Sequence, residues 1–298
     1  MLLVALPFAA AALHQPFWVN ACTRILIYAL VAVSLDLIVG YGGMVSFGHA
    51  AYFAAGGYTV AVLAQNGTES ALIAWPTAIV VSAALAAVVG ALSLRTSGIF
   101  FIMITLAFAQ MVFFALIAVK AWGSNDGLPL GARSVLPGLD LRDPNVLYAV
   151  CLLLLVAFVV ASAQLVESRF GIVLRGARRS ERRLLALGFP TFRYKLVAFV
   201  IAGAGAGLAG ALWAEYARFV SPDMASWSRS GEFLVMVILG GIGTLAGAVY
   251  GAAALVGLES LLAGFTEHWM LLLGVILLAI VLFAKRGLYG WLAGTNDG

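Results

Sequence analysis

Charged residues are scarce in this sequence. Asp, Glu, Lys and Arg make up only 10% of its 298 residues, whereas 63% are hydrophobic and the mean hydropathy is +1.06. A soluble domain carries about 25% charged residues. The composition therefore excludes an ordinary soluble protein. It predicts an all-α, polytopic transmembrane helical bundle that forms a single domain over residues 1–298.

The residues and motifs of catalysis and metal binding are also sparse. Cys22 and Cys151 lie within or beside apolar runs and form no disulfide or metal-binding pattern, and the three histidines are far apart. The sequence has no G-x-x-x-x-G-K-[ST] phosphate-binding loop. We therefore predict no enzymatic activity, no metal site and no ATP hydrolysis by this chain alone. Residues 1–19 lack the basic start of a cleaved signal peptide, so we expect a retained membrane segment there.

The positive charge is concentrated in one stretch, residues 167–195 (ESRFGIVLRGARRSERRLLALGFPTFRYK). It holds eight of the seventeen basic residues and only two acidic ones, between two long apolar runs. A Lys/Arg-rich loop between membrane segments belongs on the cytoplasmic side. Because the basic pI comes largely from this loop, it does not indicate a nucleic-acid partner.

Within this loop, residues 173–187 are predicted to form a short helix. Ala177, Leu184 and Leu185 share one side of it at positions i, i+7 and i+8. Gly188 is well placed as the residue that ends the helix, and Pro190 prevents its continuation. The residues leave two interpretations open: an amphipathic helix on anionic lipid, or a docking helix that inserts into a soluble partner.

Ten stretches are candidates to cross the membrane, since about 20 apolar residues span the hydrocarbon. They are residues 1–19, 21–39, 47–65, 71–94, 98–119, 146–165, 196–214, 231–245, 247–263 and 268–284. With 167–195 inside, this order places both chain ends inside and the loops 120–145 and 215–230 outside. The first stretch is interrupted by prolines and the eighth is short and glycine-rich. The prediction is therefore eight to ten spans.

Glycines break the apolar runs at 40–48 (GYGGMVSFG) and at 240–251 (GGIGTLAGAVYG). Neither can be a uniform lipid-facing helix, and discontinuous segments point to the translocation site of a transporter. The alternative is a pair of tight turns whose glycines allow close packing. If the breaks line a pathway, the hydroxyls of Ser46 and Thr244 could hydrogen-bond a passing zwitterion. The candidate pathway residues are Gly40, Gly43, Ser46, Gly48, Gly240, Gly243, Thr244 and Gly247.

Two other stretches have a distinctive composition. Gly203, Gly207 and Gly210 form a small-residue stripe on one helix face, which predicts close helix packing. Residues 120–145 contain Asn-Asp-Gly and three prolines, which predict an ordered outer loop that serves as a docking surface or vestibule.

Polar residues inside the apolar runs are few. Asp36 and Glu259 are candidate functional carboxylates, but we expect both to lie near span ends in contact with water. His49 follows the first glycine break and is predicted to be a hydrogen-bonded packing residue.

These segments, in this order, resemble the inner-membrane permeases of ABC importers for branched-chain amino acids, the hydrophobic amino acid uptake family. The resemblance runs from about residue 25 to residue 291. It is most specific in residues 40–63, 168–188, 194–212 and 232–252 and in the closing KRGLYGW. WGSNDGLP resembles the family's Gly-Ser-Asp-Gly-Leu loop, and the chain is similar to the paired permease with the longer periplasmic loop. The resemblance implies a fold like that of ten-helix sugar permeases.

The resemblance also implies a function and partners. The chain would be a permease subunit that moves branched-chain or other small apolar amino acids across a bacterial inner membrane into the cytoplasm. Its partners would be a second homologous permease, two cytoplasmic ATPases that bind the ATP, a periplasmic solute-binding protein and membrane lipid. It would need no cofactor of its own. Alternatives are an ABC permease for urea, short amides or small organic acids, or an ion-coupled secondary transporter.

Residues 175–188 correspond in this resemblance to the family's coupling helix, R-A-x-R-x-x-E-x-R-A-x-A-L-G. The matches, together with the apolar residues expected to fill a cleft on the ATPase, are Arg175, Ala177, Arg178, Glu181, Arg183, Leu184, Leu185, Ala186, Leu187 and Gly188. The departures are Gly176 and Leu184 for alanine, Arg179 and Leu185 where acidic residues are frequent, Asp36 for Asn and Ala248 for Pro. They leave the ATPase surface and the substrate less specified than the family.

Overall fold

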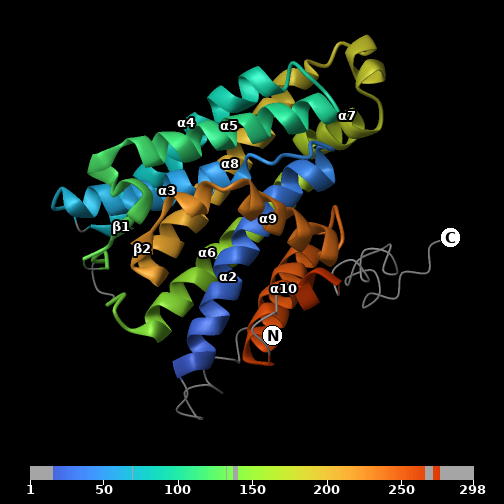
Figure 1. Cartoon of the computed structure of the whole chain (residues 1–298). Coiled ribbons are helices and arrows are strands. Elements are labelled where there is room, and N and C mark those ends of the chain that lie inside the picture. Colours follow the sequence, from blue (N-terminus) through green and yellow to red (C-terminus); the bar gives the residue numbers. More distant parts are fainter. Residues whose placement is uncertain (1–15, 69, 132, 137–139, 266–270, 276–298) are drawn as a thin grey trace.

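The computed structural model describes residues 16–68, 70–131, 133–136, 140–265 and 271–275, and it is built almost entirely of helices (Figure 1). The helices are α2 (Pro16–Asp36), α3 (His49–Gln65), α4 (Ala71–Ser93), α5 (Ile99–Ala118), α6 (Pro144–Glu167), α7 (Arg169–Ala186), α8 (Thr191–Ala217), α9 (Trp227–Gly240) and α10 (Leu245–Phe265). A π-helical turn, η1 (Leu37–Tyr41), continues α2. The short elements are η2 (Lys120–Trp122), η3 (Ser124–Asp126), η4 (Pro222–Ala225), β1 (Leu128–Pro129) and β2 (Phe219–Val220). The predicted fold class is confirmed.

Six of the described helices are long and apolar enough to cross a membrane: α2 with η1, α4, α5, α6, α8 and α10. By contrast, α3 and α9 have only 17 and 14 residues. At 1.5 Å per residue they reach about 26 and 21 Å, short of a hydrocarbon core of about 30 Å. The predicted third and eighth spans are therefore partial. Most of the predicted first and tenth spans lies outside the described residues.

The connections gather at two opposite ends of the bundle. At one end β1 pairs antiparallel with β2, and Ser70 bridges to Val135. At the other end α7 contacts η1, the end of α6 and the start of α8 (Figure 1). The predicted outer loops 120–145 and 215–230 thus share one end, as the count of spans requires.

The centre of the bundle is formed by α2 and α8, which bury more of their surface than the other long helices. The glycine stripe of α8 lies against α3 and α4. A Cβ atom at Gly207 would meet Ser82 of α4, one at Gly56 would overlap the Gly207 carbonyl, and one at Gly210 would overlap the Phe53 carbonyl. These contacts confirm the prediction that the stripe serves close packing.

An apolar surface surrounds this centre on the side of α4, α5 and α6. Val80, Met103 and Leu153 are each more than 60% exposed on these helices. In α4 and α5 no described residue is charged. This surface is suited to contact with hydrocarbon.

Two helices begin inside the bundle instead of at its ends. After η1, residues 42–48 leave helical structure, and the Phe47 amide donates to the Thr105 hydroxyl of α5 (3.2 Å). Thr105 is the seventh residue of α5, so this contact lies about 10 Å along it. The Ala50 amide of α3 donates to Ser230 Oγ of α9 (3.1 Å). The starts of α3 and α9 therefore lie side by side within the bundle.

Candidate functional site

Three segments that the sequence singled out meet at the α7 end of the bundle. Arg178 of α7 donates from Nη1 to the Gly40 carbonyl, and its aliphatic part lies over Gly43. The two glycine breaks also touch each other, because a Cβ at Gly40 would fall within van der Waals distance of the Gly243 backbone. Arg178 also lies close to the second break, because a Cβ at Gly243 would be 3.7 Å from its Nη1. One basic side chain thus lies against two breaks that are about 200 residues apart in the sequence.

Asp36 holds this junction together. It is the last residue of α2 and is fully buried, and its Oδ1 accepts a hydrogen bond from the Gly243 amide at 2.7 Å. Gly243 has φ +84°, a conformation that glycine adopts at little cost. The prediction that Asp36 is in contact with water was wrong, because the turn between α9 and α10 closes over it. That turn supplies the amide that hydrogen-bonds Oδ1.

The remaining candidate pathway residues have local partners. Ser46 is buried and its hydroxyl accepts from the Gly48 amide (3.1 Å), directly before α3. Thr244 Oγ1 donates to the Gly241 carbonyl (2.7 Å). At the end of α9, Gly240 packs against Gly247 backbone to backbone. The predicted role of these residues in a pathway stays a prediction.

Helix α7 is broken at Ser180, whose φ of −161° and ψ of 95° are extended. The prediction of one continuous helix over 173–187 was therefore wrong. The first half buries Val173, Leu174 and Ala177 against the bundle, and the second half folds back so that Leu184 lies over Gly176. The predicted shared face of Ala177, Leu184 and Leu185 does not form.

The second half of α7 is fixed to the start of α8. Glu181 forms an ion pair with Lys195 (Oε2–Nζ 2.7 Å) and accepts from the Thr191 hydroxyl (3.0 Å). Burial by itself would raise the pKa of Glu181. The hydrogen bonds and charge of Lys195, together with Thr191, outweigh it and hold that pKa below its usual value.

The end of α7 follows the prediction closely. Gly188 has φ +84°, its amide donates to the Leu185 carbonyl (3.0 Å), and the Phe189 amide donates to the Leu184 carbonyl (3.1 Å). This is the Schellman arrangement that ends helices at a glycine. Sequence reasoning missed Phe189, although an apolar residue directly after such a glycine is common.

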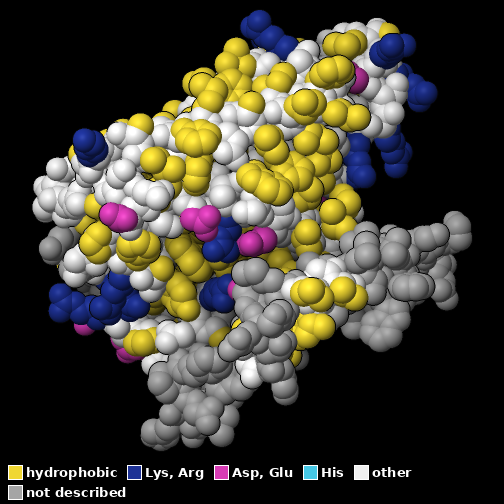
Figure 2. Space-filling view, in the orientation of Figure 1, with side chains coloured by type: hydrophobic (Ala, Val, Ile, Leu, Met, Phe, Trp, Pro, Cys, Tyr) yellow, Lys and Arg dark blue, Asp and Glu magenta, His cyan; other side chains and the backbone are white. Residues whose placement is uncertain are grey.

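Three exposed apolar residues lie at this end of α7 among basic side chains. We call them the α7 tip: Leu185, Leu187 and Phe189, of which Leu187 is 68% exposed. Arg175, Arg182 and Arg183 are exposed nearby. Figure 2 shows basic side chains gathered at this end of the molecule.

Two other predicted polar residues are partnered. His49 is fully buried and its Nε2 lies 3.3 Å from Ser34 Oγ, which confirms its packing role. Glu259 pairs with Arg24 at 2.7 Å, and both side chains are about one quarter exposed. The prediction that Glu259 is simply hydrated was incomplete, because α2 supplies a cation to it.

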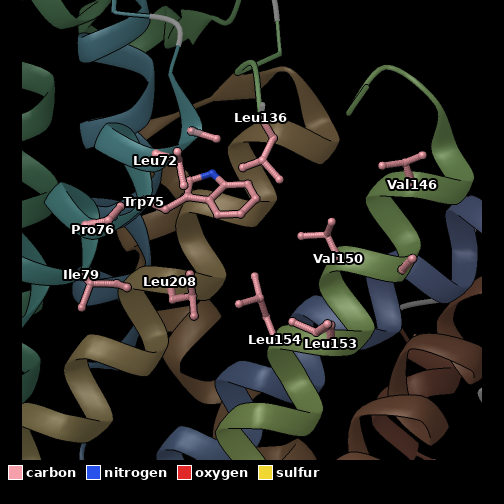
Figure 3. Close-up of a pocket in the computed structure, with 12 residues that line it drawn as sticks. Leu72, Trp75, Pro76, Ile79, Leu136, Val146, Val150, Leu153, Leu154 and Leu208 are labelled. Carbon is pink, nitrogen blue, oxygen red and sulfur yellow. The ribbon is translucent and has the colours of Figure 1, made fainter. Parts of the chain in front are cut away.

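A groove of about 550 Å³ lies between α4, α6 and α8 (Figure 3). Trp75 and Pro76 form one wall, and Val150 and Leu154 lie opposite them. Its lining is apolar, so it fits a hydrocarbon chain and offers no partner to a charged solute.

Comparison with known proteins bears on all of these features. The family described as branched-chain amino acid transport system / permease component has a model that matches residues 17–281. The chain belongs to this family. The permease is 29% identical to the high-affinity branched-chain amino acid transport system permease protein LivM of Salmonella typhimurium, over 91% of this chain and 69% of that protein. It is 24% identical to the LivH permease protein of the same organism, over 93% and 95% of the two chains. No solved structure matches.

Proposed function

We propose that this permease is one subunit of an ABC importer that carries branched-chain or other small apolar amino acids into the cytoplasm. Two partner ATPases bind and hydrolyse the ATP, and a second homologous permease and a periplasmic solute-binding protein complete the assembly. The transporter lies in a bacterial inner membrane, and both ends of this chain are in the cytoplasm. Family membership and the printed functions of the relatives support this proposal.

The arrangement of α7 carries the proposal. An amphipathic helix on lipid needs one continuous apolar face, but α7 is broken at Ser180 and its first half buries Val173, Leu174 and Ala177. The apolar side chains exposed at the end of its second half are those of the α7 tip. An apolar tip within a basic rim suits a cleft on a soluble partner that carries acidic groups at its edge. Arg178 connects this helix to both glycine breaks.

Uptake measurements test the substrate and the energy source. In the native host, deletion of this chain should abolish uptake of radiolabelled leucine, and a plasmid copy should restore it. Intact leucine uptake with lost urea uptake would assign the chain to the urea and amide transporters of the family. Leucine uptake that survives ATP depletion but stops when ion gradients are dissipated would identify an ion-coupled transporter.

Docking through the α7 tip is tested by Leu187→Asp. A charge at the centre of an apolar contact should reduce co-purification of the ATPase at least tenfold while the permease stays folded in the membrane. Arg182→Ala is the control and should have little effect, because an exposed ion pair contributes about 0–1 kcal/mol. ATPase recovered with Leu187→Asp at the wild-type yield would refute docking through this tip.

Orientation is tested by labelling single cysteines. Ala186→Cys should react from the cytoplasm and Asn125→Cys from the outside, since both positions are exposed at opposite ends of the bundle. Native Cys22 and Cys151 are buried and should contribute little background. Labelling of both engineered cysteines from the same side would contradict the orientation.

A further inference from the structure

Three charged side chains form a cluster at the beginning of α9, which we call the α9 charge cluster: Asp223, Arg229 and Glu232. Arg229 Nη1 lies 2.9 Å from Glu232 Oε2, and Arg229 Nε lies 3.9 Å from Asp223 Oδ2. Their side chains are between 31% and 69% exposed. Figure 2 shows acidic and basic side chains side by side among hydrophobic ones near the centre of this face.

The cluster lies at membrane depth. Ser230, between Arg229 and Glu232, receives the Ala50 amide at the start of α3. The chain enters α3 beside Thr105, about 10 Å along a 20-residue membrane helix. Met224 of η4 contacts Gly57, the ninth of the 17 residues of α3, so η4 is level with the middle of that helix.

Such a surface cannot face lipid hydrocarbon. Half-exposed charges at this depth are costly unless they meet protein or water. The extended residues on either side of the 3-10 turn η4, Ser221 and Ser226, are tolerated at membrane depth only under the same condition. The surface of α4 and α5 shows the contrast, because its exposed residues are apolar. The α9 charge cluster therefore faces protein or a water-filled space.

We propose that the α9 charge cluster lines the water-filled route of the substrate, and that Arg229 and Glu232 bind the carboxylate and the ammonium group of a zwitterionic amino acid. This inference rests on the proposed import function and assigns two residues to the two charges of its amino-acid substrate. A zwitterion carries its two charges a few ångströms apart, on the scale of the Arg229–Glu232 pair. When a zwitterion binds, the Arg229–Glu232 ion pair is replaced by two new ones: Arg229 pairs with the carboxylate and Glu232 with the ammonium group. Asp223 is a second acceptor for the ammonium group.

The surroundings of the cluster suit a passing solute. The half-exposed pair remains hydrated, so each exchange is weak and reversible, as a conduit requires. Trp227, the first residue of α9, is 57% exposed and adds an apolar side chain to the surface at this end of the helix. Urea and short amides have no ionised groups that could pair with Arg229 and Glu232.

Cysteine accessibility in the assembled transporter tests the route. Ser228→Cys is exposed at the cluster, and Val80→Cys, exposed on α4, is its matched control. The charged reagent 2-(trimethylammonium)ethyl methanethiosulfonate should modify Ser228→Cys at least tenfold faster than Val80→Cys. Leucine supplied with the binding protein should slow the reaction at Ser228→Cys alone. An inert Ser228→Cys in a transporter that still imports leucine would overturn the route and leave the import function standing.

Substitution of the pair tests the binding role. Arg229→Gln and Glu232→Gln should each raise the KM for leucine uptake at least fivefold, with the assembled complex at its wild-type level. An unchanged KM in the assembled complexes would overturn the binding role. If Arg229→Gln does not assemble, the milder Glu232→Gln variant and the accessibility of Ser228→Cys decide the question. If Ser228→Cys reacts but the wild-type transporter does not import leucine, the proposed substrate is refuted while the water-lined surface at α9 stands.

Discussion

The surface of α4, α5 and α6 differs from the surface at the start of α9 in helix length and in the polarity of the exposed side chains. These two properties determine whether a surface can face lipid. The first surface consists of full-length helices whose exposed side chains are apolar, such as Val80 and Met103. The second consists of a short helix, a 3-10 turn and an exposed ion pair between Arg229 and Glu232.

The two surfaces are suited to different solvents. Backbone and side-chain polarity change together, because a helix that starts inside the membrane exposes amides as well as charges. The apolar composition of the chain thus includes two kinds of surface, one suited to lipid and one suited to protein and water. We expect the effect of changing a charged group to fall from the lipid-facing surface, to the contact between two helices, to the region outside the membrane helices.

The largest effect is expected when a charge is placed on the lipid-facing surface. Val80→Arg should cost about 2.5–3.5 kcal/mol, the penalty for arginine at the centre of a membrane helix, and should sharply reduce the inserted protein. Ser228→Arg should insert at close to the wild-type level. Quantitative blotting of membrane fractions measures both. Equal losses for the two variants would remove the distinction between the surfaces.

An intermediate effect is expected for the Arg24–Glu259 pair, which joins α2 to α10 and is only partly exposed. Interhelical polar contacts in membranes contribute about 0.6–1.7 kcal/mol. A double-mutant cycle with Arg24→Gln and Glu259→Gln, read from unfolding in detergent, should give a coupling energy in this range. A value of zero would show that both groups are fully hydrated.

The smallest effect is expected at Glu181, which lies outside the membrane helices. Glu181→Gln should cost about 0–1 kcal/mol because the pair is partly exposed. The pKa of Glu181 is lowered in the folded protein, so its contribution is present above the ordinary value of about 4.3 and is lost as the pH falls through the folded value. The thermal midpoints of variant and wild type should therefore differ at pH 7 and converge in acid. A constant difference across this range would contradict the role of the carboxylate.

Local features of the fold could be predicted from the sequence. Hydropathy located the long helices, because a membrane span depends on composition over a fixed length. Gly188 marked the end of α7, because positive φ favours glycine regardless of tertiary context. The stripe at Gly203, Gly207 and Gly210 gave the packing of α8, because its spacing already defines a helix face.

Features that depend on distant contacts could not be predicted in this way. At the break at Ser180 the chain folds back, so that Leu184 lies over Gly176 and Glu181 forms an ion pair with Lys195. No local sequence pattern predicts this fold-back. Likewise, the burial of Asp36 depends on an amide more than 200 residues away.

The start of α9 carried a signal that was missed. Ser226 accepts a hydrogen bond from the Arg229 amide (3.5 Å) as the N-cap of this helix. Serine is a preferred N-cap residue, so the polar run 221–230 contained a helix start as well as an outer loop. Recognition of this start would have placed Arg229 and Glu232 on a helix face.

The small ladder between β1 and β2 has a mechanical consequence. Leu128 pairs with Val220, and the Leu130 amide donates to the Arg218 carbonyl (2.9 Å). The loop that contains β1 is therefore hydrogen-bonded to the strand that leads through η4 into α9. Only two residues separate Val220 from Asp223, so we expect a displacement of this loop to move the α9 charge cluster as well.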